Sequence, residues 1–324
     1  MSPPVEFHPR LIEETVWNAV RGRGDAGLFH RERETIYREP DPEARDHDFS
    51  RLCLAWFERL DLEKPIARAL ADVAHGLDAG RGLVTAGGLA TAGGLNAARR
   101  ILFVPATSAK REAAELFVTA GGEFTVVVAL RPETLADGAA ALTLLRGELL
   151  HVADMLDPAF GYEPRLPAQP AGPAHDRRLQ DRYRVLWDCS IDGRLARLGH
   201  VPPVSRDARL REFQRAFACL GECAEPCFER LHSGPRPRHR ELVALAADPE
   251  TAFGLRASGP SSSGRCSLCA FPTADLEPSP ERLPPEVERA IVAEFPEWKP
   301  EQGLCPQCAD LYRARPLAAC MAEP

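Results

Sequence analysis

The sequence has no uninterrupted apolar run approaching the roughly 20 residues of a membrane-spanning helix; the run at 124–130 is among the longest. Its N-terminus, MSPPVEFHPR, lacks the basic stretch followed by an apolar stretch that marks a secretory signal. Lysine is scarce, with only Lys64, Lys110 and Lys299, and no basic patch stands out. These absences predict a cytoplasmic protein that is not inserted in a membrane.

The charge balance is acidic. Forty Lys and Arg residues stand against 47 Asp and Glu residues, which gives a formal net charge of −7. Such a chain repels phosphate backbones and anionic lipids unless cations are locally concentrated. We therefore expect a protein partner and no nucleic-acid partner.

The length of 324 residues suggests two or three compact units, since domains usually have about 100 to 200 residues. A helix is predicted to begin near Asp41, with Pro42 at its first position. Apolar periodicity further predicts strands at 101–104 and 124–130 and helices at 109–117, 135–155, 178–198 and 285–295. The fold class that follows is α+β.

A tandem glycine repeat, TAGGLATAGGL, lies within residues 76–100. It lacks the Gly-Lys-Ser/Thr ending of a phosphate-binding P-loop. We interpret this segment as a flexible loop.

Four of the ten cysteines form two Cys-x-x-Cys pairs, Cys266 with Cys269 and Cys305 with Cys308. In a chain without an export signal such pairs favour a metal site over disulfides. Four thiolates satisfy one tetrahedral Zn²⁺ and leave no open position, so the predicted zinc is structural. The spacing resembles that of zinc ribbons and treble clefs, with the helix at 285–295 filling the 35-residue gap.

A second motif lies inside the helix at 135–155, where Gly147-Glu-Leu-Leu-His151 resembles the HExxH helix of zincin metallopeptidases. In that family two histidines one turn apart bind zinc, and the glutamate polarises the attacking water. Glu148 and His151 match the motif, while Gly147 replaces the first histidine. The resemblance implies that Glu148 is the general base and His151 is a ligand of a second zinc. Asp154 shares their helix face.

The downstream sequence Trp187-Asp188-Cys-Ser-Ile-Asp192 resembles the second helix of gluzincins. The resemblance implies that Asp188 is a further metal ligand. It also implies that Asp192 orients His151 from the second coordination shell. A competing, metzincin-like register would use Asp157 instead of Asp188.

Glycine has no side chain with which to bind metal. The loss of one of four ligands costs very roughly 3 kcal/mol, about a hundredfold in affinity. The leading hypothesis is therefore a metallopeptidase-like pseudoenzyme, whose residual activity would be hydrolysis of a peptide or amide bond by metal-activated water. The alternative is a non-enzymatic adaptor that binds a protein partner through its C-terminal zinc domain.

Three further cysteines, Cys219, Cys223 and Cys227, are spaced by four residues and are interpreted as free thiols. Tyr162 and Arg194 are both candidate hydrogen-bond donors to an oxyanion. Alternatively, Tyr162 caps a helix and Arg194 forms an ion pair with a carboxylate.

The expected organisation has five parts: a helical N-terminal region at 1–75, the glycine-rich loop at 76–100, a zincin-like domain at 101–200, a helical connector at 201–254 and a four-cysteine zinc domain at 255–324.

Overall fold

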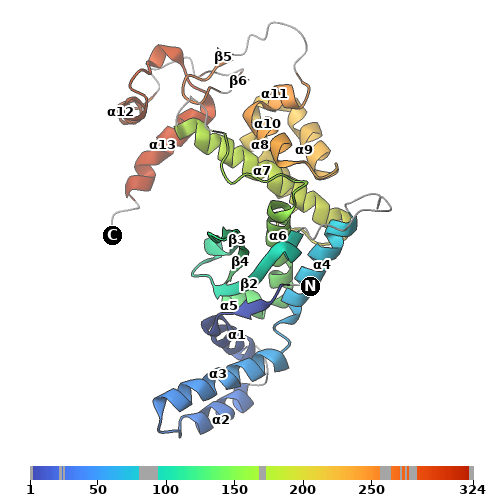
Figure 1. The fold of residues 1–324 in the computed structure, drawn as a ribbon. Coiled ribbons are helices and arrows are strands. Elements are labelled where there is room, and N and C mark those ends of the chain that lie inside the picture. The colour runs from blue at the N-terminus through green and yellow to red at the C-terminus, as the bar shows by residue number, and fades with distance from the viewer. Residues whose placement is uncertain are drawn as a thin grey trace. The chain divides into compact units, whose positions relative to one another are not determined.

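A computed structural model of the chain describes residues 3–21, 24, 26–79, 94–167, 173–255, 264–270, 272–273, 276 and 283–320. The chain divides into two compact units, Met1–Tyr162 with Ile191–Ser205, and Glu163–Ser190 with Arg206–Pro324. The predicted zinc domain and all of the predicted connector except 201–205 fall in the second unit, and the predicted zincin-like domain is divided between the two units. Helices and strands are both present, and the predicted α+β class is confirmed (Figure 1).

The first unit contains a four-stranded sheet in the order β1-β2-β4-β3. β1, β2 and β4 run parallel, and β3 pairs with β4 in the antiparallel direction at the edge of the sheet. Alternate residues of the central strands, such as Phe103, Val126 and Val128, are buried. The strands are β1 (Val5–Phe7), β2 (Ala98–Pro105), β3 (Ala113–Val118) and β4 (Phe124–Leu130).

The helix predicted at 109–117 is wrong, because most of this segment is the edge strand β3. A single 3-10 turn at Ala109–Arg111 precedes the strand. Gly122, at φ +79°, allows the tight turn that returns the chain to β4, and Thr119 N donates to Glu123 O there. Pairing with β4 therefore overrides the helix propensity of the Ala- and Leu-containing sequence.

One helix of the first unit begins at its predicted signal. Asp41 caps α3 by accepting hydrogen bonds from the backbone nitrogens of Glu43 and Ala44, and Pro42 is its first residue. Asp137 caps α6 and divides the predicted 135–155 helix into a short α5 and a long α6. These helices are α1 (Pro9–Arg21), α2 (Ala26–Ile36), α3 (Pro42–Arg59), α4 (Lys64–Ala79), α5 (Pro132–Ala136) and α6 (Gly138–Leu156).

Both ends of the segment predicted as a glycine-rich loop, 76–100, belong to regular elements. α4 extends to Ala79, and a 3-10 turn at Gly94–Ala97 leads directly into β2. Most of the TAGGLATAGGL repeat lies outside the described residues.

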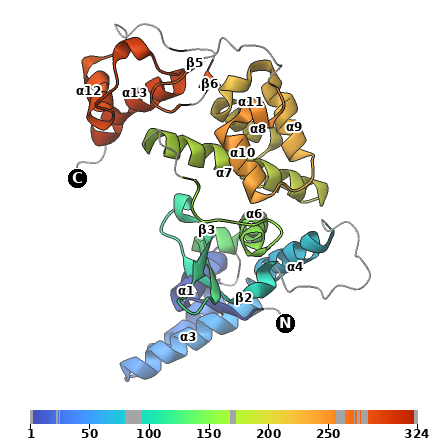
Figure 2. The same cartoon turned by 45° about the horizontal axis from the view of Figure 1, so that its top comes forward.

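The second unit holds a helical part and a C-terminal module. Figure 2 draws the helices of the helical part. Among their side chains, Phe213 contacts the rings of Phe217, Phe228 and Phe253, with centroids 4.6 to 6.5 Å away. The helices of this part are α7 (Pro173–Arg197, of which residues to Ser190 belong to this unit), α8 (Arg206–Ala216), α9 (Ala224–His232), α10 (His239–Ala247) and α11 (Pro249–Ala252).

The C-terminal module begins with a two-stranded antiparallel ribbon and ends with two helices. Its elements are β5 (Gly264–Arg265), β6 (Pro272–Thr273), α12 (Pro285–Glu294) and α13 (Pro306–Cys320). The helix predicted at 285–295 is confirmed. Residues 256–263, which precede the module, lie outside the described residues. No described helix in either unit has both the length and the apolar character needed to cross a membrane.

Candidate metal centre

The first cysteine pair lies on the turn between β5 and β6. Ala270 N donates to Cys266 O at 2.8 Å and closes the turn, and Ala270 itself has a positive φ of 55°. Ser267, inside the turn, accepts a hydrogen bond from Trp298 Nε1 at 3.0 Å and donates to Gly303 O. The turn is thereby attached to the chain that leads into the second pair.

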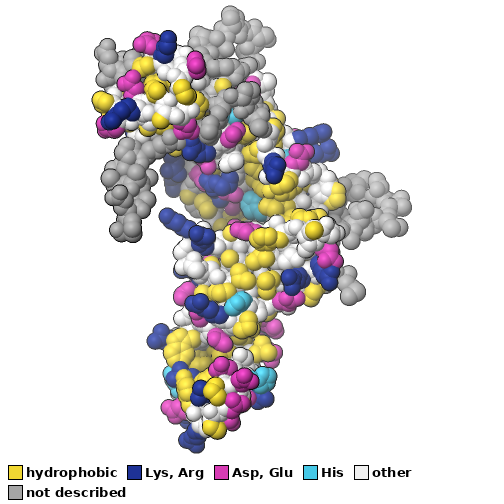
Figure 3. Space-filling model, turned by 60° about the vertical axis from the view of Figure 1, so that its left-hand side comes forward, with side chains coloured by type: hydrophobic (Ala, Val, Ile, Leu, Met, Phe, Trp, Pro, Cys, Tyr) yellow, Lys and Arg dark blue, Asp and Glu magenta, His cyan; other side chains and the backbone are white. Residues whose placement is uncertain are grey.

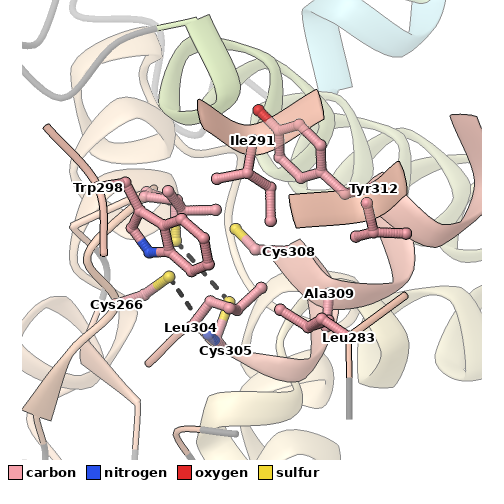
Figure 4. Close-up of a cluster of buried hydrophobic side chains, with 12 residues drawn as sticks. Cys266, Leu283, Ile291, Trp298, Leu304, Cys305, Cys308, Ala309 and Tyr312 are labelled. Atoms are coloured by element: carbon pink, nitrogen blue, oxygen red, sulfur yellow. Dashed lines mark hydrogen bonds between the residues drawn. The ribbon is translucent and has the colours of Figure 1, made fainter. Parts of the chain in front are cut away.

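The second cysteine pair lies at the start of α13. Cys305 immediately precedes the helix and Cys308 is in its first turn, where Ala309 N donates to Cys305 O at 3.1 Å. Cys305 N also donates to Cys266 Sγ at 3.3 Å, which joins the two pairs (Figure 4). Residues far apart in the sequence thus converge through backbone geometry.

The four Sγ atoms lie within 4.8 Å of one another, and all four cysteines are buried. The distance between Cys269 Sγ and Cys305 Sγ is 3.8 Å. Zinc bound to thiolates at about 2.3 Å in a tetrahedron requires sulfurs roughly 3.8 Å apart. The donor set therefore fits a single metal ion of the size and preference of Zn²⁺.

Hydrogen bonds among the four sulfurs lower the pKa of Cys266 and Cys305 and raise the pKa of Cys269 and Cys308. The hydrogen bond with Cys269 lowers the pKa of Cys266 to about 6, and the hydrogen bond with Cys266 lowers the pKa of Cys305. An apolar shell surrounds the sulfurs and excludes water. It consists of Leu268, Leu283, Val287, Ile291, Trp298, Leu304, Ala309 and Tyr312 (Figure 4).

The N-terminal turns of α7 reach this centre. Arg178 Nη1 donates to Cys305 Sγ at 3.0 Å and to Cys269 Sγ at 3.2 Å, and its Nη2 donates to Cys308 Sγ at 3.4 Å. One turn earlier, His175 Nδ1 lies 2.6 Å from Cys269 O. Three of the four sulfurs thus share one guanidinium.

The charge of Arg178 suits this position. Burial lowers the pKa of its guanidinium, but the sulfurs of Cys308, Cys269 and Cys305 raise it by more, so that the net pKa lies above the ordinary value. Four thiolates with one Zn²⁺ would carry a net charge of −2, half of which a single buried cation offsets. Sequence reasoning missed Arg178 because nothing in an arginine-rich helix distinguishes it from its neighbours.

The residues of the GELLH motif lie on α6 in the first unit. Glu148 is half-buried, and its Oε2 accepts a hydrogen bond from Ala114 N of β3 at 3.0 Å. His151 is half-buried one turn further on. Gly147 packs against the segment after α7, because a Cβ placed there would be 2.9 Å from Pro203 Cγ. The position of the missing histidine is filled by a proline ring.

The aspartates named with this motif are engaged in ion pairs or buried. Asp154 is fully buried, and both of its carboxylate oxygens accept from Arg194 Nη1, at 2.7 and 2.9 Å. Asp188 belongs to the second unit, where its Oδ2 accepts from Arg184 and Arg209 at 3.1 Å each. Asp192 is 2% exposed.

Among the residues that the structure describes, the four cysteines are the one group of three or more potential ligands with donor atoms this close together. The group includes neither Glu148 and His151 nor the cysteines at 219, 223 and 227. Of these last three cysteines, Cys227 is buried and Cys223 is exposed. Cys219 Sγ accepts a hydrogen bond from Arg182 Nη2 at 3.5 Å.

The chain matches no protein-family model, no curated protein and no solved structure. The resemblance to zincins accordingly rests on the motif residues themselves. The description of the four-cysteine cluster uses only this chain's own atoms and needs no related protein.

Proposed function

We propose that this protein is a non-enzymatic adaptor whose C-terminal module is held in shape by one structural zinc and binds a protein partner. The observation that carries the proposal is the buried four-cysteine cluster with Arg178 against three of its sulfurs. A site with four protein ligands has no position for substrate or for an activated water. Bound zinc would supply a cross-link between the two cysteine pairs.

A protein partner is favoured by charge. Residues 256–323 contain seven basic and ten acidic side chains, so the C-terminal module does not offer the basic surface that nucleic acid requires. Buried, reduced thiols also suit the cytoplasmic location expected from the sequence.

The proposal is tested by elemental analysis of the chain purified without added metal. We expect one zinc per chain in the wild type and in His151→Ala, and almost none in Cys266→Ser or Cys305→Ser. A matched control is Cys53→Ser, which changes a buried cysteine in the first unit and should retain the metal. Zinc that remains bound in Cys266→Ser and Cys305→Ser, or a wild type that holds no zinc, would contradict the proposal.

A second candidate function is metal-assisted hydrolysis of a peptide or amide bond, with Glu148 as general base and His151 as a ligand. It is favoured by the position of Glu148 and His151, both half-buried one turn apart on a helix beside the edge strand β3. This function requires a second zinc. A zinc content of two that falls to one in His151→Ala, with hydrolysis abolished by Glu148→Gln, would support it over the adaptor.

A further inference from the structure

A groove of about 510 Å³ lies beside the cysteine cluster, entirely within the second unit. Its walls come from α7, α8 and α13. Five arginines line it against two carboxylates, on a chain whose overall charge is negative. The charged lining residues are Arg177, Arg178, Arg182, Arg184, Arg215, Asp181 and Glu212.

Hydrogen bonds hold the three walls together. Gln307 Nε2, from α13, donates to the backbone oxygen of Arg215 on α8 at 2.6 Å. Arg182 Nε, from α7, donates to Ala216 O on α8 at 3.0 Å. The contact of Arg178 with Cys308 completes the set, so the metal centre forms part of one wall. A groove built in this way is preorganised, which reduces the entropy lost on binding.

Three of the five arginines, Arg177, Arg184 and Arg215, are exposed, whereas Arg178 is half-buried against the sulfurs and Arg182 is 2% exposed. The side chains of Arg177 and Arg184 are 48% and 58% exposed although each has an acidic neighbour, and ion pairs at such exposure are weak enough to exchange partners. Arg215 is exposed, and among the described residues its side chain makes no ion pair. Leu311, 38% exposed, adds an apolar contact to the wall. Figure 3 shows one face of the molecule, on which dark-blue Lys and Arg side chains lie among magenta Asp and Glu side chains.

We propose that this arginine-lined groove binds an acidic peptide segment of the partner protein. The inference rests on the proposed adaptor function and names the chemistry that the partner must present. A nucleic acid is disfavoured because none of the lining residues is aromatic, so the groove offers no ring on which a base could stack.

The test uses the full, zinc-loaded chain and a fluorescein-labelled octaglutamate peptide, followed by fluorescence anisotropy. We expect saturable binding that weakens as salt is added, and a Kd raised about tenfold in Arg215→Glu. Asp181→Asn removes a negative charge from the groove and should lower the Kd. The matched control is Arg240→Glu, an exposed arginine on α10 that does not line the groove, with a Kd within about twofold of the wild type.

Three results would overturn the inference: no saturable binding by a chain that holds one zinc, equal losses in Arg215→Glu and Arg240→Glu, or tighter binding of an octathymidylate than of the peptide. The first of these leaves the zinc-dependent adaptor intact, because its metal would be in place and another surface would carry the partner. A chain that holds no zinc at the four cysteines contradicts the adaptor itself. The two failures are therefore distinguishable from the same protein preparation.

Discussion

The guanidinium of Arg178 and the sulfur of Cys305 are 3.0 Å apart, although 127 residues separate them in the sequence. This hydrogen bond connects the helix α7 to the cysteine cluster and places a fixed positive charge against the thiolates. The candidate metal centre is therefore built from two parts of the chain: the C-terminal module supplies the sulfurs, and α7 supplies the guanidinium.

The first prediction concerns this contact. Arg178→Ala removes three N–H···S interactions and the cation that offsets the charge of the zinc–thiolate centre. The affinity for zinc should then fall about tenfold, the lower end of the range for groups that support metal ligands, and zinc should pass to a chromophoric chelator faster than from the wild type. The control is Arg177→Ala, in which the neighbouring arginine loses only its surface pair with Glu294. Equal rates in the two variants would show that Arg178 does not support the metal.

The second prediction concerns Gly147. Gly147→Ala places a methyl group 2.9 Å from the rigid ring of Pro203, and the overpacking should outweigh the higher helix propensity of alanine. We expect a net loss of about 1 kcal/mol in the free energy of unfolding, measured by urea denaturation. The double variant with Pro203→Ala should recover that loss. If Gly147→Ala stabilises the protein, Pro203 does not occupy the position as described.

The third prediction concerns the buried pair of Asp154 and Arg194. The Asp154 side chain is 1% exposed, so Asp154→Asn leaves the guanidinium without its charged partner. The expected loss is about 3 kcal/mol or more in unfolding free energy. Asp154→Leu combined with Arg194→Met should be more stable than either single variant, because no uncompensated charge remains. Additive losses in this double-mutant cycle would mean that the two side chains do not interact.

The fourth prediction is a pH dependence at Asp72, which joins α4 to α6 through Arg146 at 2.9 Å. Burial raises the pKa of the Asp72 carboxyl, but hydrogen bonds from Arg146 and Arg68 lower it by more, so the folded pKa lies below the ordinary value. Its stabilisation is therefore present above about pH 4 and lost as the pH falls through the folded pKa. Asp72→Asn should cost about 1 to 2 kcal/mol at neutral pH, and the difference should shrink in acid.

A control for this pH effect is Asp61→Asn, because Asp61 pairs with Lys64 on the surface and its side chain is 57% exposed. We expect little change in stability at any pH in this variant. Urea unfolding of the three proteins at pH 7 and near pH 3 makes the comparison. A difference for Asp72→Asn that persists unchanged in acid would contradict the assignment.

Local sequence determined much of the second unit's metal centre and several elements of the fold. Two Cys-x-x-Cys pairs, the apolar stripe of the helix between them and the cap of α3 at Asp41 each depend on residues within a few positions of one another. Such features can be predicted from residue spacing alone, because turn geometry and the helical period relate residues that are only a few positions apart. The zincin-like interpretation of the motif at Glu148 and His151 stays a prediction.

Only the tertiary structure decided the rest. Pairing with β4 turned the segment 113–118 into a strand, and the return of the chain placed Pro203 on Gly147. The buried partner of Asp154 and the arginine over the sulfurs also come from distant positions. Each depends on which surfaces meet after folding, and one sequence read along its length carries no record of contacts between residues so far apart. Short-range spacing thus determined what could bind metal, while long-range packing decided what surrounds the sulfurs and what occupies the space beside Gly147.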